Sequence, residues 1–184
     1  MLGGARSDEA LVRRAQRGDR SAFDELVRRH RDRVYAVALR LTRDREEAED
    51  ALQEAFISAY RALPGFDARS RFSTWLHRIA VNACYDAIGR RRATVSLDAE
   101  GAFEPASPRD GFAEDATRTA LVAALAALPD EFREAVVLCD VAGLGANEAG
   151  EVLGVPAGTV KSRVFRARAL LATALREPDS PTVV

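Results

Sequence analysis

The sequence predicts an all-α protein in which two small helical domains are joined by a flexible acidic linker. Three observations support this fold class. Apolar residues recur every three or four positions along most of the 184 residues, which is the spacing of amphipathic helices. No segment alternates apolar and polar residues convincingly enough to predict a strand. Residues 93–116 contain two glycines, two prolines and scattered acids, a composition typical of a tether.

Four helices are predicted before the linker. We expect Ser7 to cap the first, which ends at Gly18, and Ser21 to cap the second. The third ends where Pro64 interrupts the chain, and the fourth closes near Gly89. The apolar stripe of the second and third helices consists of Phe23, Leu26, Val27, Val34, Val37, Ala38 and Leu41, then Ala48, Ala51, Leu52, Ala55, Phe56, Ala59 and Leu63.

Helices resume after the linker, and the chain ends in a short tail. The expected helices span 117–127, 130–142, 146–153 and 157–175. We therefore divide the chain into a first domain at 1–92, the linker at 93–116, a second domain at 117–177 and the tail at 178–184.

The last two helices have the spacing of a helix-turn-helix. A small residue, Gly150, stands where two short helices must cross closely. Gly154 occupies the turn position that needs a positive φ. The shared apolar contact falls on Leu153, Val155 and Val160. These coincidences favour a DNA-binding motif, with a plain helical hairpin as the alternative.

The final helix divides into two faces. Val160, Val164, Ala167 and Leu171 are expected to face inward. The outer side could contact base edges in a major groove, while cations flanking it would bind phosphates. Phe165 could either pack or touch a thymine methyl. The outer residues are Thr159, Ser162, Arg163 and Arg166, flanked by Lys161 and Arg168.

The formal net charge of −1 favours no partner class, but the charges are distributed in blocks. Residues 157–176 carry five bases and no acid, which suits phosphate. Cys84 and Cys139 are too few and too distant to indicate a disulfide framework or a metal site, and we expect two buried reduced thiols. No signal peptide or long apolar run is present, so we expect a soluble cytoplasmic protein without direct membrane insertion.

Aromatic and basic residues mix in the fourth helix and before it. Phe66, Phe72 and Trp75 lie among arginines that include Arg71 and Arg78. Such a mixture suits single-stranded nucleic acid, whose bases stack on flat surfaces. For Phe72 and Trp75, core packing is the better explanation of most of their area.

A polar stripe runs along the third helix, through Glu47, Asp50, Gln53 and Glu54. It could be a docking face or an ordinary solvated one. Paired carboxylates could also be catalytic, but no histidine, nucleophile or phosphate-loop motif accompanies them. We therefore expect no enzyme activity, no cofactor and no metal.

Five stretches of the chain follow one another in the order typical of a known family. They are "GDRSAFDELVRRH", "DALQEAFISAYRAL", "RFSTWLHRIAVN", "ALPDEFREAVVL" and "GVPAGTVKSRVFRAR". Through them the chain resembles the extracytoplasmic-function (ECF) group of bacterial RNA polymerase sigma factors. The resemblance covers nearly the whole chain apart from the linker and ends. It implies a four-helix sigma domain 2, a helix-turn-helix sigma domain 4, and promoter-specific transcription by core RNA polymerase. It also implies an anti-sigma factor and a response to stress.

The resemblance also assigns residues. Asp50, Gln53 and Glu54 match positions that bind the β′ clamp helices, and the second domain is expected to contact the β flap. The loop from Pro64 to Arg71 corresponds to one that captures a flipped base of the −10 element. The expected −10 and melting set is Phe66, Arg71, Phe72, Trp75, Arg78 and Asn82. The expected −35 set is Lys161, Ser162, Arg163, Phe165, Arg166 and Arg168.

Two departures from the family pattern precede the helix-turn-helix turn. Ala149 stands where isoleucine is usual, and Gly150 where alanine is usual. Both suggest a weakened supporting helix, since glycine costs about 1 kcal/mol of helix propensity. The alternative functions are a helix-turn-helix repressor or activator that binds DNA alone, and an enzyme acting on nucleic acid.

Overall fold

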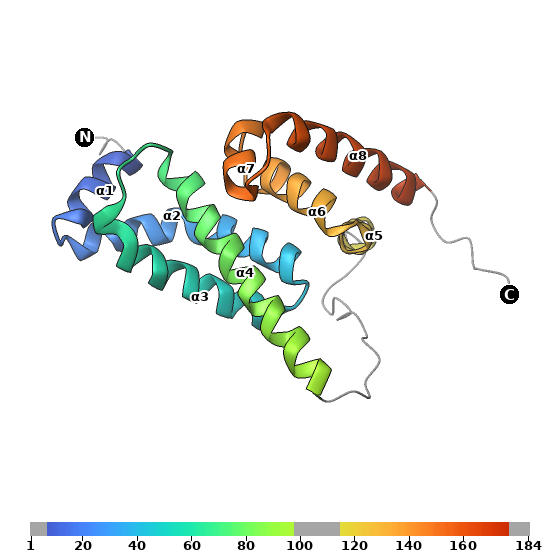
Figure 1. Ribbon diagram of the computed structural model, residues 1–184, viewed down its shortest axis with the longest axis horizontal. Coiled ribbons are helices and arrows are strands. Elements are labelled where there is room, and N and C mark those ends of the chain that lie inside the picture. The colour runs from blue at the N-terminus through green and yellow to red at the C-terminus, as the bar shows by residue number, and fades with distance from the viewer. Residues whose placement is uncertain (1–6, 98–114, 177–184) are drawn as a thin grey trace, which may run out of the picture. The chain divides into compact units, whose positions relative to one another are not determined.

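The computed structural model describes residues 7–97 and 115–176, and every regular element within these ranges is helical (Figure 1). They form two compact units that divide between Ala99 and Glu100. The predicted all-α fold with two helical domains is therefore confirmed. Most of the predicted linker and the predicted tail at 178–184 lie outside the described residues.

The first two helices begin at side-chain caps. Helix α1 (Asp8–Gln16) starts after Ser7, whose hydroxyl accepts the Ala10 N–H as predicted. Helix α2 (Arg20–Thr42) is capped by Asp19, not by Ser21. The carboxylate of Asp19 accepts the Ala22 N–H and also the Ser21 hydroxyl. As a charged acceptor, it takes the capping position from the neutral hydroxyl two residues later.

Helix α3 (Arg45–Ala62) follows a tight corner. Arg43 ends α2 in the left-handed region with φ 61°, and Asp44 caps α3 by accepting the Glu47 N–H. A 3₁₀ turn, η1 (Leu63–Gly65), follows where Pro64 was expected to stop the helix.

Helix α4 (Phe72–Leu97) does not close near Gly89 as predicted. It continues because its later turns have a partner on the α2–α3 corner. Arg91 donates to the Glu47 carboxylate at 3.1 Å and to the Thr42 carbonyl at 3.4 Å. These contacts outweigh the roughly 1 kcal/mol that one glycine costs a helix.

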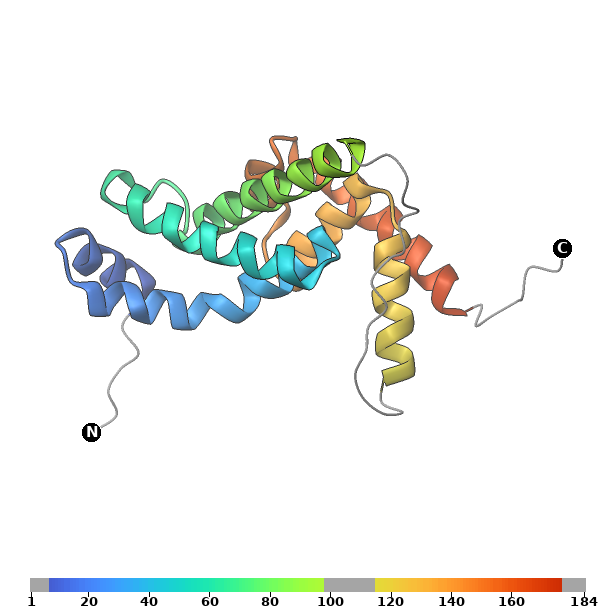
Figure 2. The same cartoon turned by 90° about the horizontal axis from the view of Figure 1, so that it is seen from below.

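The core of the first unit lies where α2, α3 and α4 pack together (Figure 2). Alanines at Ala48, Ala51, Ala55 and Ala59 of α3 are all buried, so the helix can approach both neighbours closely. The predicted stripe is buried except at Val27 and Phe56, which are half-buried.

The second unit contains α5 (Asp115–Ala127), α6 (Asp130–Val136), η2 (Val137–Val141), α7 (Ala146–Leu153) and α8 (Ala157–Arg176). The predicted helix at 130–142 is confirmed as a helical segment, but η2 is a π-helix. There the Ala142 N–H donates to the Val137 carbonyl, five residues earlier. Helix α8 packs against α5, α6 and α7, and α5 crosses it steeply (Figures 1 and 2).

The turn between α7 and α8 confirms the predicted helix-turn-helix geometry. Gly154 adopts φ 67°, and its N–H donates to the Gly150 carbonyl. A Cβ on Gly150 would lie 2.6 Å from the Val155 carbonyl oxygen, so the turn requires glycine there. Gly150 is thus a site of close helix contact, and not only a cost in helix propensity.

Candidate nucleic-acid and polymerase interfaces

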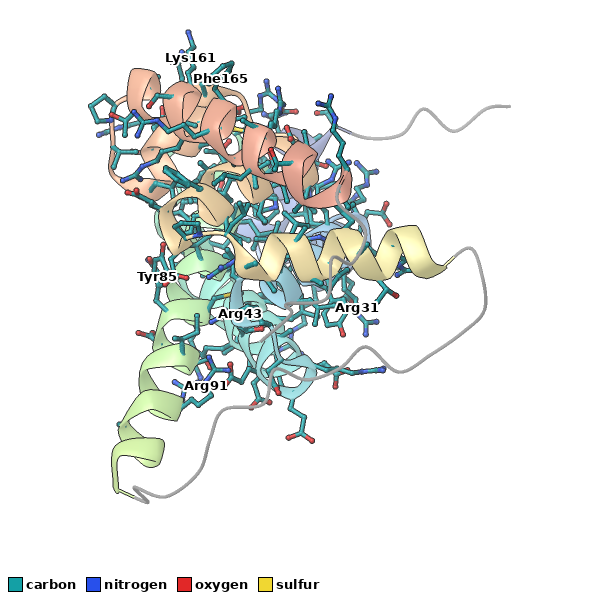
Figure 3. All side chains as sticks on the ribbon, turned by 90° about the vertical axis from the view of Figure 1, so that its right-hand side faces the viewer. Arg31, Arg43, Tyr85, Arg91, Lys161 and Phe165 are labelled. Atoms are coloured by element: carbon teal, nitrogen blue, oxygen red, sulfur yellow. The ribbon has the colours of Figure 1, made fainter. Side chains whose placement is uncertain are left out.

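The outer face of α8 is open to solvent. Val160, Val164 and Ala167 are buried against the unit, as predicted, whereas Leu171 of the same predicted face is only half-buried. Phe165 is 76% exposed, so packing within the second unit does not explain it. Figure 3 shows Lys161 and Phe165 projecting away from the helix. Among the described residues, neither Lys161 nor Arg166 has an ion-pair partner, and both can meet phosphates or bases.

Two arginines of the expected −35 set are held by acids from the preceding helices. Arg163 donates to Glu131 of α6 at 3.0 Å, and its side chain is only 22% exposed. Arg168 donates through two nitrogens to Asp140 of η2, at 3.1 and 2.6 Å. These hydrogen bonds raise the pKa of Arg168. The structure therefore separates two unpaired cations from two paired ones.

An aromatic cluster closes the α3–α4 connection. The rings of Phe66 and Trp75 are 4.8 Å apart, and those of Phe72 and Trp75 are 5.7 Å apart. Phe72 is buried, which agrees with core packing. Phe66 and Trp75 are half-buried, so each retains surface for another aromatic group.

One face of α4 continues from this cluster. Trp75, Arg78 and Asn82 follow at helical spacing, and Arg78 and Asn82 are exposed. Arg71 is exposed one turn before Trp75. Tyr85, which was not among the predicted site residues, extends the same face and is 42% exposed (Figure 3). Its spacing three residues after Asn82 is the signal that could have found it.

The predicted polar stripe of α3 divides in the structure. Asp50, Gln53 and Glu54 are exposed on one face. Glu47 is instead half-buried beside Arg91, and burial raises its pKa.

The exposed face of α3 continues into apolar side chains. Ile57 and Tyr60 are 36% and 45% exposed, although both are apolar or aromatic. They border a hollow that Phe23 of α2 also lines, with its ring 4.9 Å from that of Tyr60. The sequence pattern does not mark Ile57 and Tyr60 as site residues, because helical spacing alone does not distinguish an exposed apolar residue from a buried one.

Comparison with known proteins identifies the family. Residues 26–94 match the model of Sigma-70 region 2, and residues 118–171 match that of Sigma-70, region 4. The ECF RNA polymerase sigma factor SigM of Mycobacterium tuberculosis is 43% identical over 92% of this chain and 85% of its own length. The chain belongs to the ECF sigma factors.

Solved structures agree with this assignment. CnrH, in complex with the cytosolic domain of CnrY, matches 92% of this sigma factor and 97% of its own chain, with 30% identity and a TM-score of 0.70. The sigma factor RpoE of Bartonella quintana, in complex with the anti-sigma factor NepR, matches 85% of this sigma factor and 98% of its own chain, with 27% identity and a TM-score of 0.74. The sigma factor is thus a transcription initiation factor that binds core RNA polymerase and directs it to promoters.

Two further properties of the sigma factor follow from the described residues. No described helix is both long and apolar enough to cross a membrane. Within the same ranges, no group of three or more histidines, cysteines or acids could hold a metal ion.

The two cysteines of the sigma factor are expected to differ in reactivity. Burial raises the pKa of Cys84 to about 12, and the side chain is fully buried. Burial also raises the pKa of Cys139, but this thiol is only partly covered, so the prediction of two buried thiols is wrong for Cys139. Titration of the folded protein with a thiol reagent at pH 8 should label Cys139 slowly and Cys84 only after unfolding. Rapid labelling of Cys84, identified by peptide mapping, would contradict the buried position.

Proposed function

We propose that this sigma factor contacts its promoter through two separate surfaces, the outer face of α8 and the face of α4 with its preceding loop. It carries out no catalysis of its own and works in the cytoplasm, where polymerase and promoter DNA are found. The observation that carries this proposal is that each unit has a basic surface with an aromatic ring open to solvent, Phe165 largely and Trp75 in part.

The α4 surface serves the −10 element. Phe66 and Trp75 offer partly exposed rings on which an unstacked base can lie, and Arg71 and Arg78 stand on the same side for the backbone. Asn82 offers an amide to the edge of a base. Unstacking a base costs a few kcal/mol, so melting would favour weakly stacked steps.

The α8 surface serves the −35 element. Lys161 and Arg166 bring unpaired cations to the groove, and Ser162 and Phe165 are exposed between them. Contacts with the phosphates would position the helix, while Phe165 and Arg166 would contact bases. Each footprint is small, so tethering both units to polymerase makes the second contact effectively intramolecular.

The ion pairs of Arg163 and Arg168 are expected to limit nonspecific DNA binding. The variant carrying Glu131→Gln and Asp140→Asn frees both guanidinium groups for phosphates. Its affinity for duplex DNA should rise several-fold at low salt, and the slope of log K against log salt should steepen by about 0.9 for each arginine freed. Fluorescence anisotropy over a range of salt concentrations measures both.

The matched control neutralises another acid of the same unit. Glu151 is exposed on α7 and forms no ion pair with a described residue. Glu151→Gln should therefore raise the affinity only slightly and leave the slope nearly unchanged. An unchanged slope in the double variant would contradict the idea that these ion pairs keep the two arginines from phosphates.

Polymerase binding is assigned to the exposed face of α3. Asp50, Gln53 and Glu54 are exposed and can pair with polar groups of the β′ clamp helices, although Glu54 also accepts the Ser58 hydroxyl at 2.9 Å. Ile57 and Tyr60 add apolar area beside them. In the second unit, exposed apolar side chains suit the β flap. They are Leu121 and Val122 of α5 and Leu170 and Leu175 of α8.

An anti-sigma factor holds the free protein inactive until a stress signal releases it. This part of the proposal is supported by the complex of the related RpoE with the anti-sigma factor NepR. The exposed apolar side chains of both units are surfaces that such a partner would cover. Pull-down from stressed and unstressed cells tests this, and recovery of polymerase alone under both conditions would contradict it.

Run-off transcription with purified core polymerase tests the central proposal. A cognate promoter should be transcribed only when core and sigma factor are both present. Replacing Asp50, Gln53 and Glu54 by alanine should abolish the product, whereas Asp32→Ala, an exposed acid of α2, should not. Tight, specific duplex binding by the sigma factor alone, without transcription in the presence of core, would support a simple repressor or activator instead.

A further inference from the structure

The carboxyl end of α1 is hydrogen-bonded to the start of the α3–α4 loop. The side-chain amide of Gln16 donates to the carbonyl oxygens of Leu63, at 3.0 Å, and Phe66, at 2.8 Å. These carbonyls lie 47 and 50 residues later in the chain. One amide group therefore fixes the spacing of two backbone groups on either side of Pro64 and Gly65.

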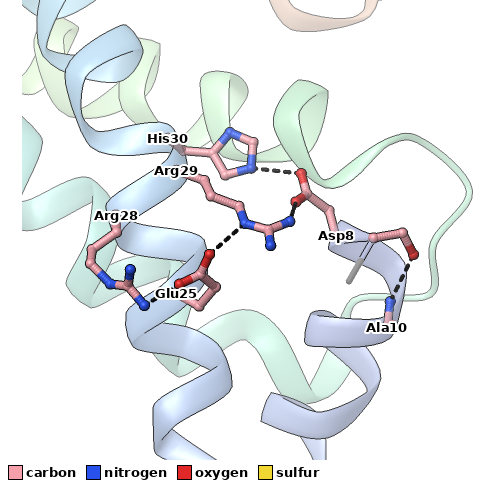
Figure 4. A network of polar contacts seen from close by, with 7 residues as sticks. Asp8, Ala10, Glu25, Arg28, Arg29 and His30 are labelled. Carbon is pink, nitrogen blue, oxygen red and sulfur yellow. Dashed lines mark hydrogen bonds and ion pairs between the residues drawn. The ribbon is translucent and has the colours of Figure 1, made fainter. Parts of the chain in front are cut away.

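The amino end of α1 supports the far end of the same loop through His30 (Figure 4). The Asp8 carboxylate lies 2.7 Å from Nε2 of His30, and Arg29 also donates to it at 3.2 Å. The His30 ring is buried, and it contacts the ring of Phe72 edge-on at 5.3 Å. Phe72 is the first residue of α4, where the loop ends.

Between these supports the loop is exposed and strained. Asp67, Ala68 and Arg69 are exposed, and Ala68 adopts φ 59°, which is unfavourable for a residue with a Cβ. Arg69 donates its backbone N–H and its guanidinium group to Asp67, which closes the tip on itself. A tip of this kind keeps one shape only if its two ends are held.

We propose that α1 is a brace for the base-capturing loop, with Gln16 and Asp8 as positioning residues that hold Phe66 and Phe72 around Trp75. This inference rests on the proposed −10 function of that loop. The α1 residues need not touch DNA. They act by keeping the loop in its base-accepting shape before the base arrives, so that less ordering is required on binding.

Gln16→Glu tests the brace with almost no change in shape. A carboxylate cannot donate, and it would face two carbonyl oxygens instead of pairing with them. Trp75 is the only tryptophan of the chain and lies against Phe66, so its emission in the full-length protein without DNA reports the loop directly. We expect a shift of this emission and faster hydrogen exchange at residues 66–71.

The functional measurement uses the labelled non-template strand of the −10 element, from a promoter that the sigma factor opens in run-off transcription. Loss of two hydrogen bonds should weaken binding of this single strand by about tenfold. Binding of −35 duplex and of core polymerase should not change. Asn147→Asp makes the same chemical change at an exposed position of α7 and should leave both readouts as in the wild type.

Each outcome decides for or against the brace. An unchanged Trp75 emission and unchanged exchange in Gln16→Glu would overturn it, whether or not the protein directs transcription. A changed loop with unchanged single-strand affinity would also overturn it, because the loop's shape would not matter to capture. Failure of the wild type to transcribe would instead refute the proposed function, while the DNA-free measurement would still report on the loop.

Discussion

Replacing Gly150 by valine is expected to lower the free energy of unfolding of the second unit by about 3 kcal/mol. A Cβ at this position meets the backbone carbonyl oxygen of Val155 at 2.6 Å, and no side-chain rotation can relieve that clash. The same carbonyl belongs to the turn that Gly150 itself stabilises by accepting the Val155 N–H at 3.0 Å. Since a domain this small has only a few kcal/mol of stability, −35 binding should be largely lost near 37 °C.

The control is the same substitution at Gly158, in the first turn of α8. A Cβ there meets nothing within 4 Å, so Gly158→Val should change stability by less than about 0.5 kcal/mol. Circular dichroism reports unfolding of both units, whereas Trp75 fluorescence reports only the first. The Gly150 variant should therefore lose part of its helical signal at lower temperature with the Trp75 transition unchanged. Identical melting of the two valine variants would contradict the close approach.

Removing the guanidinium group of Arg133 is expected to cost the second unit about 2 to 3 kcal/mol. Arg133 is only 4% exposed, and it donates to the carbonyl of Leu128 at 2.6 Å and to that of Ala126 at 3.3 Å. These carbonyls lie at the carboxyl end of α5, Ala126 in its last turn and Leu128 just beyond it, where a cation also meets the negative end of the helix dipole. In Arg133→Leu the apolar volume is retained, but both carbonyls lose their donor in a buried place.

Two further variants separate the hydrogen bonds from the ion pair. Arg133 also pairs with Asp130, whose side chain is 61% exposed, so Asp130→Asn should cost less than about 1 kcal/mol. Arg133→Lys keeps the charge but loses the planar fork, and should fall between the other two. Chemical denaturation followed by circular dichroism gives the three values. Equal losses in Arg133→Leu and Asp130→Asn would mean that the ion pair, and not the carbonyl contacts, stabilises α5.

Patterns within single helices predicted most of the fold. Caps at Ser7, apolar spacing in α2 and α3, and the glycine at position 154 are local signals, and each produced the expected element. Two errors arose for different reasons. Ser21 lost its capping role to Asp19, a competing local signal two residues earlier. Gly89 failed to end α4 because Arg91 reaches a corner formed more than forty residues earlier.

The site shows the same division. The sequence placed the α8 cations, the α4 aromatics and the α3 stripe on their helices, because spacing along one helix determines which residues share a face. It left open whether Phe165 packs inward, and the structure leaves that ring in solvent. It could not distinguish Arg163 and Arg168 from Arg166, since their acidic partners lie 32 and 28 residues away.

The sequence by itself therefore determined the helices, their buried faces and the helix-turn-helix, because these depend on residues three to ten positions apart. Only the tertiary structure decided that Gly150 must be glycine, that Glu47 leaves the α3 face to pair with Arg91, and that Gln16 holds the loop before Phe66. Each of these depends on two segments meeting at a specific distance. A hydrogen bond or a steric clash changes within a few tenths of an ångström, and helical periodicity carries no information at that scale.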